Sequence, residues 1–422
     1  MNRITLFLLC TTFLCPVLVV TSINTTHYND DWVNTSLKNM SLREKIGQLF
    51  ILAAVADESR HKDFMVTAPY NITTDYIKHI ITTYRPGGII FLGKGTTKHI
   101  VDATNMYQTL STSPLLIALD AEWGLSMRLQ DAVVFPRNTI VGEINDVDLT
   151  YQMAQEIGRQ LTLIGVHCNL APVVDVNNNP LNPIIATRSF GDNPELVAQH
   201  SIAYMRGLHD AGILSCAKHF PGHGDTTTDS HHDLPVIEHT RSRLDTIELY
   251  PFKELIKAGT PAIMTAHLCV PALEPTRIPT SLSHTVVTDV LKNELGFTGL
   301  VITDGLGMKG VTQQYAPGDI ELQAFLAGSD MLLCPVDMPK AVALIEQAII
   351  NDTVSEQELD ARVIKILKAK QWAFSQHPAS LHPVYDYEQL HTAHAYDLQK
   401  KLTLKADAIT AGQFQEFTPT QK

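Results

Sequence analysis

Eight short apolar runs recur along this 422-residue chain, and stretches with helical periodicity separate them. The runs begin at Ile46, Gly87, Pro114, Val166, Ile213, Pro261, Gly299 and Asp330. Their nearly continuous apolar character is typical of parallel strands that are covered on both faces. Eight strands alternating with helices predict an α/β protein with a (β/α)8 TIM-like barrel, and a doubly wound sheet is the alternative.

Helical periodicity fills most of the intervals between these runs. The predicted helices span residues 74–84, 146–163, 194–211, 241–258, 283–295, 319–326 and 339–351. The pattern fades near residue 370, and one further helical stretch follows at about 390–411. We therefore expect a barrel domain at 30–372 and a short C-terminal helical tail at 373–422.

The N-terminus has the pattern of an export signal. Arg3 precedes a mostly apolar run over residues 4–20, which ends near small residues. This pattern predicts a signal peptide over residues 1–22, with a secreted, periplasmic or cell-envelope location; a retained membrane anchor is the alternative. The remaining cysteines, Cys168, Cys216, Cys269 and Cys334, each lie in an apolar segment, so we expect buried thiols and no disulfide framework.

Composition excludes one class of partner. The formal net charge is −12, the acidic residues are scattered, and no block of Lys and Arg stands out. This pattern lacks the basic footprint of a nucleic-acid-binding protein, so we expect no nucleic acid partner.

Polar side chains follow five of the predicted strands at their carboxyl ends. They are Asp120, Glu122, Asp175, Lys218, His219, His267 and Asp304. Barrel enzymes place their chemistry at this end of the strands. The coincidence over five strands predicts a functional site, although any one of these residues can also be a satisfied strand-end group.

The stretch KHFPGHGDTTTDSHHDLP, residues 218–235, concentrates His, Asp and Gly behind the fifth run. In its Asp229-x-His231 element, the carboxylate can fix the imidazole tautomer and make His231 a general acid/base. Two alternatives stay open, a purely structural loop and a zinc site. The zinc ligands would be drawn from His223, Asp225, Asp229, His231, His232 and Asp233.

Two further segments carry candidate chemistry. In GLVITDGLGM, residues 299–308, the apolar strand ends in Asp304, a carboxylate that can act as a nucleophile at an anomeric carbon or merely serve as a helix cap or turn residue. Asp120 can accept hydrogen bonds from ligand hydroxyls, and Trp123 offers a face for a sugar ring or a lid over the core. Arg188 is either a ligand to an anion or hydroxyl, or a salt-bridge partner.

Taken together, KHFPGHGD-TTT-DSH, VITDGLGM, LDAEWGLSMR, LAPVVDVNNNP, RSFG and MTAH resemble family 3 glycoside hydrolases of the bacterial β-N-acetylglucosaminidase type, from about residue 42 to 367. The resemblance implies that Asp304 is the nucleophile and that His231 is the acid/base, with Asp229 as its partner. It further implies that the sugar is held by Asp120, Arg188, Lys218 and His219, with His267 near that site.

The activity that this resemblance implies is that of a retaining exo-β-N-acetylglucosaminidase, a β-N-acetylhexosaminidase, with an N-acetylglucosamine-containing glycan as its partner. The substrates would be peptidoglycan fragments or chitooligosaccharides, and neither a metal nor an organic cofactor is needed. The form of residues 120–128 is similar to that of exported Bacteroidetes-like members, and residues 391–410 resemble the first helix of a second domain. The alternatives are a metal-dependent hydrolase on a barrel, a β-glucosidase-like or phosphorylase activity, and a non-catalytic glycan-binding relic.

Overall fold

The computed structural model describes residues 30–57, 59, 71–227 and 234–416. The predicted signal peptide, residues 1–22, lies outside these ranges. Within them, none of the helices has both the length and the hydropathy that crossing a bilayer requires.

Eight parallel strands form the centre of the molecule. They are β1 (Phe50–Val55), β2 (Gly88–Leu92), β3 (Leu116–Leu119), β4 (Cys168–Asn169), β5 (Leu214–Phe220), β6 (Ala262–Thr265), β7 (Leu300–Thr303) and β8 (Leu332–Leu333). Each strand pairs with its neighbours in chain order, and β8 returns to pair with β1. A bridge between Ile302 and Met331 brings β7 next to the segment entering β8. The predicted (β/α)8 barrel is confirmed, with all eight apolar runs as its strands.

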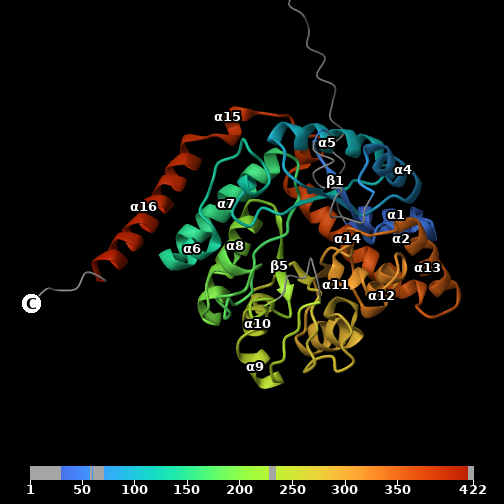
Figure 1. The fold of residues 1–422 in the computed structure, drawn as a ribbon. Helices are drawn as coiled ribbons and strands as arrows, with labels where there is room; N and C mark the ends of the chain where they lie inside the picture. The colour runs from blue at the N-terminus through green and yellow to red at the C-terminus, as the bar shows by residue number, and fades with distance from the viewer. Residues whose placement is uncertain (1–29, 58, 60–70, 228–233, 417–422) are drawn as a thin grey trace, which may run out of the picture.

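Burial explains why these runs form strands. All six residues of β1 and all seven of β5 are buried, including the charged Lys218 at the carboxyl end of β5. Helices cover the outer face of the barrel (Figure 1), and the side chains on the inner face are buried as well, so the strands are shielded on both faces. Their apolar sequences therefore reflect two-sided burial in a parallel sheet.

The helices surround the strands in the order that the alternation predicts. The main ones are α1 (Asp30–Asn39), α2 (Leu42–Gly47), α4 (Thr74–Tyr84), α5 (Thr97–Leu110), α6 (Asn138–Ile144), α7 (Val147–Leu163), α8 (Pro194–Asp210), α9 (Arg241–Thr246), α10 (Tyr250–Lys257), a π-helical segment (Thr285–Glu294), α11 (Lys309–Thr312), α12 (Asp319–Ala327) and α13 (Met338–Ile350). The prediction of one helix over 241–258 was wrong, because α9 ends at Thr246 and Pro251 lies in the first turn of a separate helix, α10. Helix α5 was not predicted.

The C-terminal part begins with a long helix that belongs to the barrel. Helix α14 (Glu356–Gln376) contains the boundary that we placed between residues 372 and 373. It is followed by α15 (Tyr387–Leu390) and α16 (Ala393–Glu416). Helix α16 lies beside α6, and its C-terminal end points away from the barrel (Figure 1).

A buried lysine lies at the amino ends of the strands. The Nζ atom of Lys370, on α14, donates to Oε1 of Gln48 at 2.7 Å, just before β1 begins. The same Gln48 side chain donates to the carbonyl of Arg85 at 2.7 Å. Burial lowers the pKa of Lys370 to about 7. This contact belongs to the end of the barrel opposite the strand-end residues discussed below, where conserved chemistry is rarely placed.

Candidate active site

The structure brings four of the predicted sugar-binding residues together at the carboxyl ends of β3, β4 and β5. Lys218 donates to Oδ1 of Asp120 at 2.8 Å and lies 2.8 Å from Oε1 of Glu122. Arg188 binds Glu122 with two hydrogen bonds, at 2.9 Å from Nε and 2.7 Å from Nη2. Arg128 donates to the other oxygen of Asp120 at 2.7 Å.

Charge balance explains how so many ionised groups are tolerated here. Burial by itself would raise the pKa of Glu122, but Arg188 and Lys218 outweigh burial and lower this pKa to about 2. Burial would likewise raise the pKa of Asp120, and Lys218 and Arg128 hold it well below its usual range. Each carboxylate thus stays ionised because two cations contact it.

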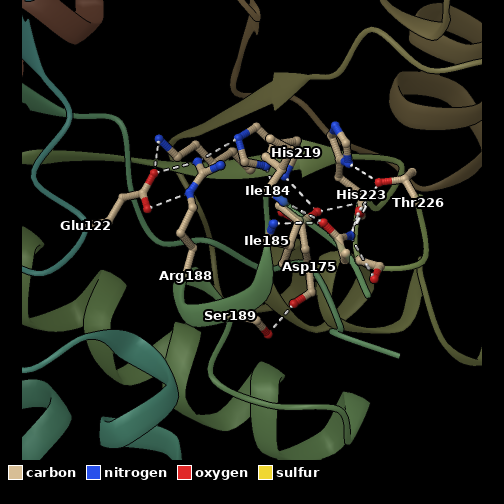
Figure 2. Close-up of polar contacts among 12 residues, drawn as sticks. Glu122, Asp175, Ile184, Ile185, Arg188, Ser189, His219, His223 and Thr226 are labelled. Atoms are coloured by element: carbon tan, nitrogen blue, oxygen red, sulfur yellow. Dashed lines mark hydrogen bonds and ion pairs between the residues drawn. The ribbon is translucent and has the colours of Figure 1, made fainter. Parts of the chain in front are cut away.

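His219 is oriented by partners on both ring nitrogens (Figure 2). Its Nδ1 lies 2.7 Å from Oδ2 of Asp175, and its Nε2 lies 3.2 Å from Nη2 of Arg188. A guanidinium can only donate, so Nε2 accepts and the ring proton sits on Nδ1, where it is donated to Asp175. Asp175 also accepts the backbone N–H groups of His219 and His223, at 3.1 and 2.7 Å.

Asp304 lies directly after β7 and is partly exposed. Its backbone N–H donates to the carbonyl of Thr265 at 2.9 Å, and its Oδ1 accepts the N–H of Gly305 at 2.7 Å. The next helix, α11, has Met308 as its N-cap, so Asp304 does not cap a helix. Burial lowers the pKa of the nearby His223 to about 4, and the negative charge of Asp304 is among the groups that oppose this shift.

His267 is fully buried behind Asp304. Its Nε2 lies 2.9 Å from the carbonyl oxygen of Gly305, to which it donates, and its Nδ1 lies 2.6 Å from the hydroxyl of Ser281. A carbonyl can only accept, so the proton is on Nε2. The geometry places His267 as a support for the backbone that follows Asp304.

Asn182 ties the loop after β4 to the loop after β5. Its amide nitrogen donates to the carbonyls of His223 and Gly224 at 2.9 and 3.0 Å, while its oxygen accepts the N–H groups of Ile184 and Ile185 at 2.9 Å each. The predicted acid/base pair, Asp229 and His231, falls in residues 228–233, outside the described residues. Both assignments therefore stay predictions.

Sequence reasoning missed several residues of this site. Glu122 and Asp175 were noted only as strand-end groups, and the roles of Arg128 and Asn182 were not predicted at all. The available signal was position: Glu122 and Asp175 follow the predicted third and fourth strands. Their partners lie 66 and 44 residues away along the chain, which only the barrel register can specify.

Trp123 is contacted by a cation on one face. The guanidinium carbon of Arg137 lies 4.3 Å from the centroid of its ring, and the indole is partly exposed. The four cysteines of the described residues, Cys168, Cys216, Cys269 and Cys334, are buried free thiols, as expected.

One group in the described residues has the composition of a metal site. Ligand atoms of Asp225, His239 and Glu248 all lie within 4.8 Å of one another. A guanidinium already contacts the two carboxylates, because Nη2 of Arg243 is 3.3 Å from Glu248 and 3.7 Å from Asp225. Of the zinc ligands considered from the sequence, this group includes only Asp225; His223 instead contacts Thr226 through Nδ1 at 2.9 Å.

Comparison with known proteins supplies independent evidence. Residues 41–369 match the model of the glycosyl hydrolase family 3 N terminal domain. A β-hexosaminidase A of Pseudoalteromonas piscicida is 34% identical over 327 residues, which are 70% of this chain and 54% of that protein. A β-hexosaminidase of Nitrosomonas eutropha is 30% identical over 321 residues, which are 72% of this chain and 85% of that protein.

A solved structure is similar over most of the chain. The family 3 β-N-acetylglucosaminidase of Paenibacillus sp. str. FPU-7 is 34% identical, with a TM-score of 0.77, and the match covers 87% of this chain and 69% of that one. Fold and site together define a (β/α)8-barrel protein with a buried, charge-balanced cluster at the carboxyl ends of its strands. The chain belongs to glycosyl hydrolase family 3. It spans about half the length of the Pseudoalteromonas relative.

Proposed function

We propose that the protein is a retaining exo-β-N-acetylglucosaminidase that removes terminal β-N-acetylglucosamine through a covalent glycosyl-enzyme. The observation that carries this proposal is Asp304, a partly exposed carboxylate that follows β7 at the same end of the barrel at which Asp120, Lys218, Glu122 and Arg188 form their cluster. The names of the relatives, which include β-hexosaminidases and a β-N-acetylglucosaminidase, support the same activity.

In the first step, a carboxylate oxygen of Asp304 forms a bond to the anomeric carbon as the bond to the leaving oxygen breaks. His231 donates its proton to that oxygen, so the aglycone leaves as an alcohol. In the second step, water attacks the same carbon, His231 takes a proton from the water, and the Asp304 carboxylate is released. Two displacements at one carbon retain the β configuration.

A histidine acid suits the electrostatics of this site. The cations Arg128, Lys218 and Arg188 equal in number the carboxylates Asp120, Glu122 and Asp175, of which Asp175 contacts His219, so the carboxylate of Asp304 adds a net negative charge. A carboxylate acid/base would add another negative charge beside it, whereas an imidazole is neutral or cationic. The balanced cluster would hold the sugar hydroxyls and acetamido group with groups that are oriented before the substrate arrives.

The natural substrates in this proposal are peptidoglycan fragments or chitooligosaccharides, and peptidoglycan is favoured. The proposed location is outside the cytoplasm or at the cell envelope, because residues 1–22 have the pattern of a signal peptide. The chemistry uses only side chains of this chain, with no metal or organic cofactor.

The proposal is tested by hydrolysis of an aryl N-acetyl-β-glucosaminide with the wild type, Asp304→Asn and His231→Ala, each with and without a chelator. We expect Asp304→Asn to lose at least about 10⁴-fold in kcat, and His231→Ala about 10²- to 10⁴-fold. The wild type should keep its activity in chelator, and proton NMR should detect the β anomer as the first product.

Matched controls are available within the same regions. His232→Ala changes the neighbouring histidine and should keep near-wild-type activity, as should Asp289→Asn, whose side chain is 55% exposed. Turnover abolished by chelator would favour the metal-dependent hydrolase, and release that requires phosphate would favour a phosphorylase. Sugar binding without turnover in the wild type would identify a glycan-binding relic.

A further inference from the structure

A compact polar cluster is formed by residues that precede and follow segment 228–233 in the chain, and it is not used in the mechanism above. It consists of Asp225, His239, Arg243 and Glu248, which we call the stem cluster. Nε2 of His239 is 2.5 Å from Oδ2 of Asp225. Arg243 contacts both carboxylates, and Glu248 is 2% exposed.

The stem cluster joins the two ends of the segment 228–233. Asp225 lies three residues before this segment and His239 six residues after it, so their contact closes a loop of 15 residues. Closing a loop restricts the conformations of the chain within it, because its ends can no longer move independently.

The residues before segment 228–233, which include Gly224 and Thr226 and which we call the N-terminal stem, are fixed to the barrel. The Thr226 hydroxyl accepts a hydrogen bond from the side-chain amide of Asn182 at 3.3 Å and lies 2.9 Å from Nδ1 of His223. The backbone carbonyl of Thr226 accepts a hydrogen bond from the side-chain amide of Asn179 at 3.2 Å. Gly224 approaches the carbonyl oxygen of Val176 so closely that a Cβ atom there would lie 1.7 Å from it. These contacts fix the position of the N-terminal stem relative to the loop that follows β4.

The residues after segment 228–233, numbers 235–239, which we call the C-terminal stem, are fixed to the segment after β6. The N–H of Cys269 donates to the carbonyl of Pro235 at 2.8 Å, and the N–H of Ile237 donates to the carbonyl of Cys269 at 2.9 Å. His239 immediately precedes Thr240, whose side chain caps α9. Arg243, on α9, then reaches back to Asp225.

The charges of the stem cluster favour an anchor over a metal centre. Two carboxylates are present, and the guanidinium of Arg243 already contacts both, at 3.3 and 3.7 Å. A divalent cation at the same place would have to displace this guanidinium and break the short contact between His239 and Asp225.

We infer that the Asp225–His239 pair, held by Arg243 and Glu248, is a positioning device that fixes both ends of the segment carrying Asp229 and His231. Its role is to place the general acid, so it rests on the proposed function of His231. Weakening the pair should impair both steps that use His231, and in kcat/KM, which reports the first displacement, the loss should depend on whether the leaving group needs a proton.

The test compares two substrates that differ in leaving group. N,N′-diacetylchitobiose releases the 4-hydroxyl of N-acetylglucosamine, a poor leaving group that needs the acid, whereas 2,4-dinitrophenyl N-acetyl-β-glucosaminide releases a stable phenolate and does not. For His239→Ala and Asp225→Ala, we expect kcat/KM on the disaccharide to fall at least 30-fold, and kcat/KM on the dinitrophenyl substrate to change less than threefold. The double variant should lose little more than either single variant.

Further variants distinguish loss of the positioning role from a nonspecific loss of activity. His239→Gln keeps a donor toward Asp225 and should recover most of the disaccharide activity. Glu238→Ala changes the adjacent side chain, which is 70% exposed, and should behave like the wild type. Equal losses on both substrates would overturn the inference, as would activity of the wild type that rises with added Zn²⁺ and falls with chelator.

The same experiment distinguishes this inference from the proposed function. His231→Ala should show the selective loss on the disaccharide in its strongest form. If His231→Ala lacks that selectivity, the assignment of the acid is wrong. If His231→Ala shows it and His239→Ala does not, only the positioning inference is wrong.

Discussion

Individual charged residues at this site depend on one another for their ionisation. Glu122 is 1% exposed and serves both Lys218 and Arg188, so it links the residues contributed by β3 and β5 with the loop after β4. Buried ion pairs of this kind give little net stability, yet removing one partner is costly because a charge is left without compensation.

Glu122→Gln should therefore destabilise the fold. Two buried cations lose their shared carboxylate, and we expect the free energy of unfolding at pH 7 to fall by about 3 kcal/mol. The folded-state pKa of Glu122 is lowered to about 2, so this stability is present above pH 4.5 and is lost as pH falls toward 2. Urea titrations at pH 7 and pH 3.5 check this: the difference from wild type should shrink at the lower pH, whereas the exposed Glu388→Gln should match wild type at both.

Asp175→Asn should disturb the tautomer of His219. The amide oxygen can still accept the backbone N–H groups, which leaves its NH₂ facing Nδ1 of His219. The ring proton then moves to Nε2, where it faces the donor Arg188. We expect kcat/KM on an aryl N-acetyl-β-glucosaminide to fall about 10- to 100-fold, equivalent to about 1.5–3 kcal/mol for one hydrogen bond to a charged group. Unchanged kcat/KM would mean that the orientation of His219 is unimportant for binding.

At this scale the sequence predicted which residues gather but not how they pair. Asp120, Lys218, His219 and Asp304 could be found because each ends an apolar run, and in a parallel barrel all such ends meet. The pairing of Arg188 with Glu122 could not, because Arg188 lies in a loop whose path is set by Asn182 and other contacts far along the chain.

Secondary-structure elements were predictable where the spacing of apolar residues and the helix-capping residues indicated the same boundaries. Helix α4 begins and ends at the predicted residues, 74 and 84, and the strands follow from their apolar runs. Helix α14 was missed although Ser355 caps it, because its buried side includes the charged Arg362 and Lys370, which obscure the apolar period. The strands of the barrel could thus be predicted from the sequence, whereas its last helix, α14, could not.

Helix α16 offers a test of what holds the C-terminal tail to the barrel. Leu402 is fully buried, whereas Leu404 on the same helix is 59% exposed. We expect Leu402→Ala to lower the free energy of unfolding by about 2–3 kcal/mol and Leu404→Ala to change it by less than about 0.5 kcal/mol. Urea denaturation of the two variants gives the comparison, and similar losses for both would show that α16 does not fold together with the barrel.

Across the whole molecule, Lys370 differs from other buried charged residues in its partner. Lys218 contacts Asp120 and Glu122 at the carboxyl ends of the strands, and Asp330 contacts Lys292 and Lys365 at the amino ends, whereas Lys370 donates to the uncharged Gln48. Burial consequently lowers the pKa of Lys370 to about 7, against 10.5 in the unfolded chain.

Because of Lys370, the free energy of unfolding should rise with pH between pH 7 and pH 10.5. Its folded-state pKa is depressed, so folding is penalised most below pH 7, and the penalty declines between pH 7 and 10.5 by up to about 1.4 kcal/mol per pH unit. Lys370→Met removes this dependence. Denaturation at pH 7 and pH 9 should show a smaller gain with pH for Lys370→Met than for the wild type, and Lys368→Met, on the exposed side of α14, should keep the wild-type gain.

The contact between Asp225 and His239 also has a consequence for redesign. Because both stems are fixed to the barrel and to each other, the intervening residues behave as a cassette with defined ends. We expect that such a cassette can be exchanged with its counterpart from a relative without altering the strands beneath it. Under the proposed function, proton transfer could then be varied separately from the groups that hold the sugar.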